Sequence, residues 1–332
     1  MKKIILTFFL VLACSAFLFA DECPTPATAT ATVTFKCKAD VPTGGFQVSP
    51  TKRVEIAKGN LMYIISLNKW EIMEEQYFEV EHKPENVGDG YWRRDTVSLF
   101  GWATSGNPLS GDRYMPTETS LFGYYCDYGN LGQPDAGDWG IGSVCEWGQN
   151  VVDDQGRGGW RTLTDDEWYY LFFERETGVT IYSPRSGHNI ENCRFVQATL
   201  LTDGTGRDSI DYDLTGYLLF PDGFVMPDDL GTDVIWDEAN NTWTRYGTKC
   251  TTEGWRKLEE AGCVFLPAAG RRLHAEVMDT YGEASLGYYW TSTATSATNA
   301  YCLRFDSSTL NARYDYVRYE GLSVRLVRDM DE

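Results

Sequence analysis

Residue types on which common catalytic sites depend are scarce in this sequence. There are only three histidines, His82, His188 and His274, and no His-Glu-x-x-His, Cys-x-x-Cys or Gly-x-Ser-x-Gly motif. These gaps remove the usual support for a zinc hydrolase or a serine hydrolase. The glycine-rich turns are not followed by Lys and then Ser or Thr, so they predict no phosphate-binding loop. We therefore expect no enzymatic activity.

Positive charge is scarce as well. The 332 residues include 29 Lys and Arg against 48 Asp and Glu, which gives a formal net charge of −19. Binding to nucleic acid or to an anionic membrane surface needs a basic face, so we exclude both partners. Oxygen ligands of the kind that calcium takes are plentiful in such an acidic protein, but their spacing singles out no site. We assign no cofactor and no metal site, and calcium is the one ion that the composition would suit.

The first twenty residues have the pattern of a secretory signal. Two lysines precede an apolar run that ends at Ala20, directly before acidic residues, which predicts a signal peptide over 1–20. The run is too short and too one-sided for a membrane span. An alternative is a lipoprotein signal with a lipid anchor on Cys14, the one attachment to a membrane that we expect. Both interpretations predict export, to the cell surface or the extracellular space.

The rest of the chain divides into a linker and one domain. Residues 21–43 are rich in Pro, Thr and Ala and offer little to bury, which is typical of a linker. We expect a single domain over 44–332. Beyond Cys14 the chain has eight cysteines, an even number that allows disulfides in an exported protein. Two pairs stay open: Cys23 with Cys37, and Cys126 with Cys145.

The first predicted helix begins after Thr164. Glu167 follows three residues later, which is the pattern of a capping box. Trp168, Leu171 and Phe172 then recur at helical spacing, so they should form the buried stripe of this helix.

A second helix is predicted within "TTEGWRKLEEAG". Thr251 or Thr252 is the expected N-cap, Trp255 and Leu258 should face the core, and Gly262 should end the helix. Such a helix rises about 1.5 Å per residue, so it should hold the flanking cysteines of "KCTTEGWRKLEEAGC" too far apart for a disulfide.

Short alternating apolar runs predict antiparallel strands on both sides of these helices, among them "GFQVS", "GYLLF", "CVFLP", "GYYWTST" and "AYCLRF". The stretch 87–160 lacks periodic runs and should form long loops rich in glycine and aromatic residues. Four tryptophans are expected in the core: Trp160, Trp168, Trp255 and Trp290. The predicted fold class is α+β, with antiparallel sheets and two main helices.

The closing run, 290–329, contains no Lys, Gln or Met and a single Glu, but much Tyr, Arg, Asp, Ser and Thr. Alternation in "AYCLRF" directs Tyr301, Leu303 and Phe305 to the core and Cys302, Arg304 and Asp306 outward. Tyr and Arg are enriched in recognition surfaces because they combine large contact area with polar groups. An ordinary solvated sheet edge is the alternative. The last strand, "RLVRD", should carry solvated arginines.

An ordered set of motifs carries a resemblance to a known family: "GFQVSPTKRVEIAKGNLMY", "GWRTLTDDEW", "FLPAAGRR", "GYYWTST", "AYCLRF" and "GLSVRLVR". Over about residues 44–328 the chain resembles the Fibrobacter major paralogous domain, a group of exported proteins of Bacteroidetes and Fibrobacter type. The resemblance implies a C-type lectin-like fold of the formylglycine-generating-enzyme branch. The copper-binding cysteine pair of that enzyme branch is missing, since only Cys302 lies among the last strands, so its activity is not carried over.

Some members of this family are variable ligand-binding proteins of diversity-generating retroelements, which rewrite adenine-containing codons near the 3′ end of the gene. Asn codons rewritten in this way never yield Lys, Gln, Glu, Met or Trp. None of these five residues occurs between Thr291 and Tyr319. Glu320 cannot arise in this way and would mark the edge of the pattern.

We therefore expect an exported binding protein for a protein or glycan ligand on a cell or phage surface, which it contacts through residues 293–320. The alternative is a structural, envelope-associated protein without a selected ligand. The expected contacts are Thr295, Ser296, Thr298, Arg304, Asp306, Arg313, Tyr314, Asp315, Tyr316 and Tyr319.

Overall fold

The computed structural model describes residues 45–64, 67–74, 76, 96–104, 146–152, 156–176, 178–183, 188–201, 214–236, 248–273, 276–278, 286–296, 298–318 and 320–330. All of them belong to one unit of the chain, 41–332. Several predictions lie outside the described residues: the signal peptide, the anchor at Cys14, the linker, both open cysteine pairs, most of the predicted loop stretch and Tyr319.

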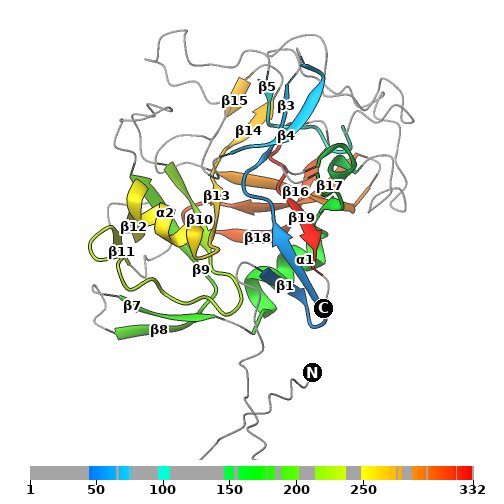
Figure 1. Ribbon diagram of the computed structural model, residues 1–332. Helices are drawn as coiled ribbons and strands as arrows, with labels where there is room; N and C mark the ends of the chain where they lie inside the picture. The colour runs from blue at the N-terminus through cyan, green and yellow to red at the C-terminus, as the bar shows by residue number, and fades with distance from the viewer. Residues whose placement is uncertain are drawn as a thin grey trace, which may run out of the picture. The chain divides into compact units, whose positions relative to one another are not determined.

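Six sheets make up the described part of the domain, and nearly all strand pairs are antiparallel. A four-stranded sheet has the order β1 (Gly45–Ser49), β2 (Lys52–Ile56), β19 (Leu326–Asp329) and β6 (Trp160–Thr162). A five-stranded sheet has the order β11 (Val234–Ile235), β12 (Thr248–Thr251), β9 (Phe195–Leu201), β10 (Leu214–Leu219) and β13 (Val264–Pro267). Only β12 and β9 run parallel among these pairs. Figure 1 shows β19 beside β2, so strands from the two ends of the described residues pair in one sheet.

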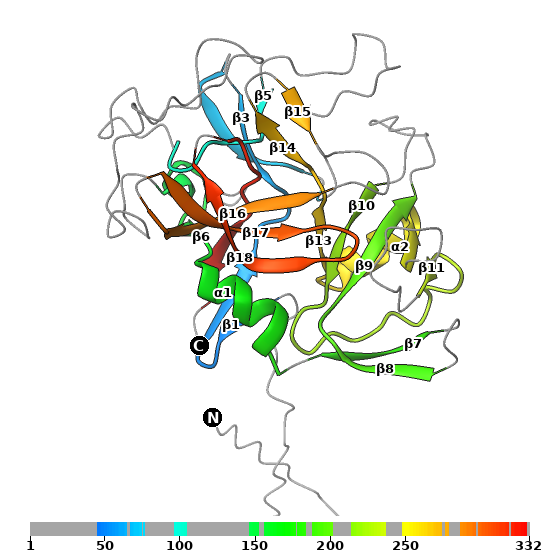
Figure 2. The same cartoon turned by 180° about the vertical axis from the view of Figure 1, so that it is seen from behind.

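The remaining sheets are smaller. Strands β16 (Gly287–Ala294), β17 (Asn299–Phe305) and β18 (Leu310–Val317) form a three-stranded antiparallel sheet in that order, and they run side by side in Figure 2. Another has the order β4 (Lys69–Ile72), β3 (Leu61–Ile64) and β5 (Thr96–Val97). Two hairpins complete the set, β7 (Val179–Ser183) with β8 (His188–Cys193) and β14 (Arg271–Leu273) with β15 (Glu276–Met278). The predicted α+β class with antiparallel sheets is confirmed.

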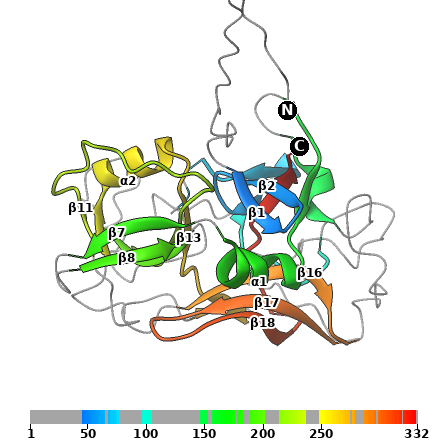
Figure 3. The ribbon, with the colours of Figure 1, turned by 90° about the horizontal axis from the view of Figure 1, so that it is seen from below.

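Helix α1 (Asp165–Tyr169) begins as predicted and continues as a π-helical turn over Tyr170–Glu174. The Thr164 hydroxyl accepts from the Glu167 amide at 3.1 Å, and the Glu167 carboxylate accepts from the Thr164 amide at 3.0 Å. This reciprocal pair satisfies two amides that the helix leaves without partners. The expected stripe is buried, and in Figure 3 α1 lies between β1 and the strands β17 and β18.

Helix α2 (Thr252–Glu260) is capped by Thr251, whose hydroxyl accepts from the amide of Gly254 at 3.1 Å. Trp255 and Leu258 are buried as predicted. Gly262 has a φ of +89°, the left-handed conformation in which glycine commonly ends a helix. All four tryptophans expected in the core are buried, and the two cysteines that flank α2 are both free. None of the described helices is both long and apolar enough to cross a membrane.

The β16–β18 sheet is packed on both faces, and this corrects one prediction. Leu303 and Phe305 join a cluster with α1 and β1, as expected. Cys302, predicted to point outward, has no exposed surface and packs with Trp102 and Trp290 in a second cluster. Alternation correctly puts Cys302 on the opposite face from Leu303, but that face is covered by aromatic side chains from distant parts of the chain.

The prediction of solvated arginines in the last strand is also wrong for Arg325. This residue is only 1% exposed, and its guanidinium donates to the main-chain carbonyls of Ala57 and Phe265. Arg328 is partly buried, with its guanidinium over the ring of Trp160 and paired with Glu55. The arginines of this segment therefore link strands instead of facing water.

Candidate binding surface

Alternation divides the predicted contact residues of β18 between two faces of the sheet, and a β-bulge decides which of them share the face of Cys302. Cys302 pairs with Tyr314 and Arg304 pairs with Asn311, so three steps along β18 match two steps along β17. The extra residue shifts the alternation. Tyr314 and Tyr316 therefore share the face of Cys302 and Arg304, whereas Arg313 and Asp315 lie on the face of α1.

The first of these faces carries a cluster of aromatic rings beside an arginine. The guanidinium of Arg304 lies over the ring of Tyr314, 5.2 Å from its centroid. The Tyr314 and Tyr316 rings are 5.6 Å apart, and the Tyr316 ring is 5.5 Å from that of the buried Tyr288. Arg304, Tyr314 and Tyr316 are each half-buried, so part of every side chain is available to a ligand. We call these three residues the aromatic patch.

Tyr316 is held in place by a charged pair beneath it. Its hydroxyl accepts a hydrogen bond from Arg271 Nη1 at 2.6 Å and donates to Glu320 Oε2 at 2.6 Å. Arg271 and Glu320 are themselves paired at 2.5 Å. Burial and the bond to the carboxylate raise the pKa of the Tyr316 hydroxyl well above its usual value, so it stays protonated. Glu320 is a buried anchor of the patch.

On the α1 face, Arg313 and Asp315 are both engaged. Arg313 Nε donates to Asp165 at 3.1 Å, Nη2 also bonds Asp166, and the guanidinium lies 4.2 Å from the ring centroid of Tyr169. The Asp315 carboxylate accepts from Asn299 Nδ2 at 2.8 Å and from the Thr295 hydroxyl. Both side chains therefore lie along the sheet face instead of extending across the edge of β18.

The other predicted contacts shape the turns at the two ends of β17. Ser296 Oγ accepts from the amides of Thr298 and Asn299 at 3.2 and 3.1 Å. Asp306 accepts from the amides of Ser308 and Thr309, each at 2.7 Å, and therefore closes the β17–β18 turn. Of the ten predicted contacts, Arg304, Tyr314 and Tyr316 form the aromatic patch. Six others lie on the α1 face or in these turns, and Tyr319 is outside the described residues.

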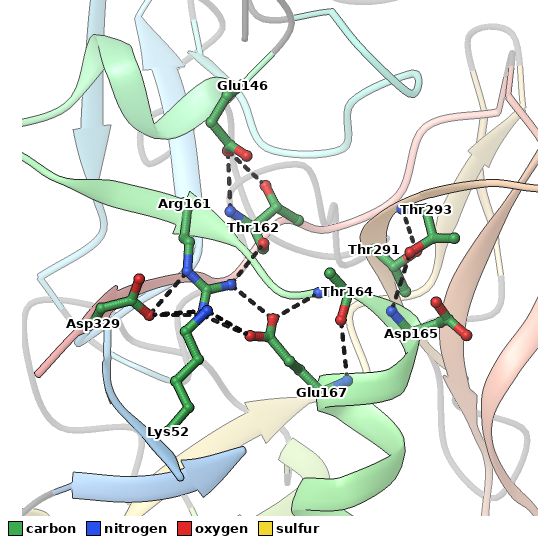
Figure 4. A network of polar contacts seen from close by, with 10 residues as sticks. All are labelled: Lys52, Glu146, Arg161, Thr162, Thr164, Asp165, Glu167, Thr291, Thr293 and Asp329. Atoms are coloured by element: carbon green, nitrogen blue, oxygen red, sulfur yellow. Dashed lines mark hydrogen bonds and ion pairs between the residues drawn. The ribbon is translucent and has the colours of Figure 1, made fainter. Parts of the chain in front are cut away.

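Figure 4 shows a buried polar network around Arg161 that no sequence motif predicted. Arg161 makes a two-pronged contact with Glu167, 2.7 Å from Nη1 to Oε2 and 2.8 Å from Nη2 to Oε1. Its Nη2 also donates to Asp329 at 2.7 Å, and Lys52 lies 3.1 Å from Glu167. Burial alone would raise the pKa of Glu167, but its bonds and proximity to Arg161 lower it overall. The network joins β2, β6, β19 and α1, and its charges are satisfied within it.

Glu146, at the top of Figure 4, is a buried carboxyl of a different kind. Its Oε1 accepts from the amide and the hydroxyl of Thr162 at 3.0 and 2.8 Å and from the amide of Gly148 at 3.2 Å, whereas Oε2 has no partner. Burial raises its pKa despite these bonds. It caps a short 3-10 helix, η5 (Trp147–Asn150). No sequence motif marked it.

The described residues contain no group of three metal-ligating side chains. An apolar groove of about 450 Å³ lies between β7 and β11, lined by Ile181, Met226, Val234, Ile235 and Trp236 among others, and none of the predicted contacts lines it. No protein-family model, curated protein or solved structure matches the chain.

Proposed function

We propose that the protein is an exported, non-catalytic ligand-binding protein with a C-type lectin-like fold, related to the variable proteins of the Fibrobacter major paralogous domain group. The observation that carries this proposal is the aromatic patch: two half-buried tyrosines of β18 beside an arginine of β17, in a sheet that is packed on both faces.

Rigidity favours binding at this patch. Ordering side chains on association costs free energy, so residues that are already held by packing bind with less loss. Tyr316 is fixed by Arg271 and Glu320, and Tyr314 is flanked by Arg304 and Tyr316. Tyrosine and arginine in such settings are the usual anchors of protein interfaces.

The charged groups of the patch support a binding role over a catalytic one. Arg304 contacts Asp306 at 3.2 Å, and Arg271 contacts Glu320, so these charges are already paired. A general base or nucleophile needs a perturbed group aimed at an open site. We propose a protein or glycan ligand on a cell or phage surface, which an exported protein would meet.

Binding of the mature chain to a glycan array and to a phage-displayed library of nine-residue peptides tests this proposal. We expect selective binding in one of the two formats, lost in Arg304→Ala/Tyr314→Ala. The matched control, Tyr170→Ala/Arg256→Ala, removes a half-buried tyrosine and an exposed arginine that are not part of the aromatic patch, and it should bind normally. Far-UV circular dichroism checks that both variants fold. Binding that survives in the patch variant, or no selective binding at all, would refute the assignment.

A further inference from the structure

We propose that the outer edge of β18 binds an extended peptide segment of a partner protein, which adds to the β16–β17–β18 sheet as a fourth strand. This inference rests on the function proposed above and names the class of partner. Two observations support it: no described strand pairs with the outer edge of β18, and the two faces beside this edge carry different side chains.

Among the described strands, none lies beside the outer edge of β18. In the sheet order β16–β17–β18, β18 comes last, and its eight residues pair only with β17 in the described part of the chain. Alternate residues of an edge strand direct their N–H and C=O groups away from the sheet. Such a row of backbone groups is a template for another strand.

Apart from its bulge, β18 lacks two residue types that commonly protect sheet edges. The strand, Leu310–Val317, contains neither Lys nor Pro. Its two charged residues, Arg313 and Asp315, are held on the α1 face by Asp165 and Asn299, so they do not project across the edge.

The bulge sets where an added strand would pair. The backbone amide of Arg313 already donates to Asn311 Oδ1 at 2.9 Å, within the irregular part of the strand. Bulges end regular pairing locally. The available edge is therefore Tyr314–Val317, the part that carries the two tyrosines of the patch, except for the Val317 carbonyl, which accepts from the Glu320 amide at 3.4 Å.

The two faces of β18 offer different groups, tyrosines on one and Arg313 and Asp315 on the other, and an extended strand is a ligand that would use both. A ligand that lies on the aromatic patch alone touches Tyr314 and Tyr316 but not Arg313 and Asp315. An extended peptide beside β18 sends alternate side chains to opposite faces, so one set would contact the tyrosines and the other the Arg313 and Asp315 side. Apolar or aromatic side chains suit the first set, and hydroxyl or amide side chains suit the second.

Peptides selected from the nine-residue library test this directly. The best binder is synthesised in two forms, each N-methylated at every second amide, so that together the forms cover both sets of amides. Backbone pairing predicts that one form binds at least about tenfold more weakly while the other binds within about threefold of the parent, because only one set faces β18. In the mature chain, hydrogen exchange should slow at β18 amides when the parent peptide binds.

Three results would overturn the inference: equal effects of the two methylated forms, unchanged exchange at β18, or a library that yields no binder. If Arg304→Ala/Tyr314→Ala abolishes binding to a glycan on the array while no peptide binds, strand addition is wrong and the function proposed above stands. If neither probe binds, both proposals fail. Tyr170→Ala/Arg256→Ala should bind the selected peptide like the parent chain.

Discussion

Nε of Arg325 donates a hydrogen bond to Oδ1 of Asn60 at 2.9 Å, although the two residues are 265 positions apart. Its other donors reach four main-chain carbonyl oxygens: Ala57 at 3.1 Å, Lys58 at 3.0 Å, Gln76 at 3.3 Å and Phe265 at 2.9 Å. Burial lowers the pKa of this guanidinium to about 10, so it remains charged at neutral pH. One side chain from the end of the chain thus satisfies acceptors from three separate segments.

Replacing this arginine should be severely destabilising. Arg325→Met keeps most of the volume but leaves five acceptors, four of them buried, without their donor, and we expect a loss of about 3–5 kcal/mol in the free energy of unfolding. Urea unfolding followed by tryptophan fluorescence measures it. Arg256→Ala, on the exposed face of α2, is the control and should leave the midpoint unchanged. A loss below about 1 kcal/mol would show that the acceptors find other partners.

The Arg161–Glu167 pair predicts a loss of stability in acid. The folded pKa of Glu167 is lowered because its bonds to Arg161 outweigh burial. Its contribution is therefore complete above the ordinary glutamate pKa and is lost as pH falls through the lower folded value. Glu167→Gln should cost about 3 kcal/mol at pH 7. The difference in unfolding free energy between Glu167→Gln and the parent chain should become smaller below about pH 4. Urea titrations at a series of pH values give this difference, and a constant difference would contradict the prediction.

Glu146 should behave in the opposite way. Burial raises its folded pKa, so its contribution is complete below the ordinary glutamate value and declines as pH rises through the folded one. Glu146→Gln keeps an acceptor for Thr162 and cannot ionise. We expect the stability of Glu146→Gln relative to the parent chain to increase from pH 4 to pH 8, in the same titrations. A relative stability that does not change with pH would show that Glu146 does not titrate in this range.

Three buried thiols should be inert in the folded protein. Burial raises the pKa of Cys250 to about 12 and those of Cys263 and Cys302 well above their usual value, and thiolate is the reactive form. Treatment with N-ethylmaleimide at pH 7.5, followed by peptide mass spectrometry, should leave these three unmodified. The same treatment in urea is the positive control. Labelling of any of the three in the native protein would show that its surroundings open.

Natural variation of the gene's 3′ end would test the proposed diversification. If outward codons are rewritten, sequences from cells of one population should differ at Arg304, Asn311 and 313–316. Cys302 and Leu303 should stay constant, because both are fully buried and a larger or charged side chain at either would disrupt the core. Deep sequencing gives the answer. Variation at Cys302 equal to that at Arg313 would contradict the structure. A uniform 3′ end would show that the gene is not being diversified in this population, and only a shared ancestry with variable proteins would then remain of the proposal.

Local features were predictable from the sequence because they depend on residues close together in the chain. The capping box of α1 involves Thr164 and Glu167, three positions apart, and the end of α2 depends on the left-handed conformation of Gly262. Buried stripes followed from helical spacing in the same way. The residue types of the aromatic patch were also found from composition alone.

Contacts between distant segments were not predictable. Alternation predicts that Cys302 lies on the opposite face of the sheet from Leu303. It does not predict that Trp102, about 200 residues earlier, lies in the cluster that buries this face. A bulge in β18 decided that Tyr314 and Tyr316, and not Arg313 and Asp315, share the face of Arg304, and no residue in β18 marks it. Arg325 has the sequence context of a surface arginine, and only its partners from other segments make its burial stable.

By itself, the sequence determined the α+β class, the starts of both helices, the buried stripes and the enrichment of tyrosine and arginine near the C-terminus. Each of these depends on spacing or composition within a few residues. The tertiary structure alone decided which of those residues lie together, which are anchors and which face of the β16–β18 sheet is covered. These outcomes depend on hydrogen bonds and packing between segments as distant in the sequence as Arg53 and Met330, and short-range patterns carry no information about such partners.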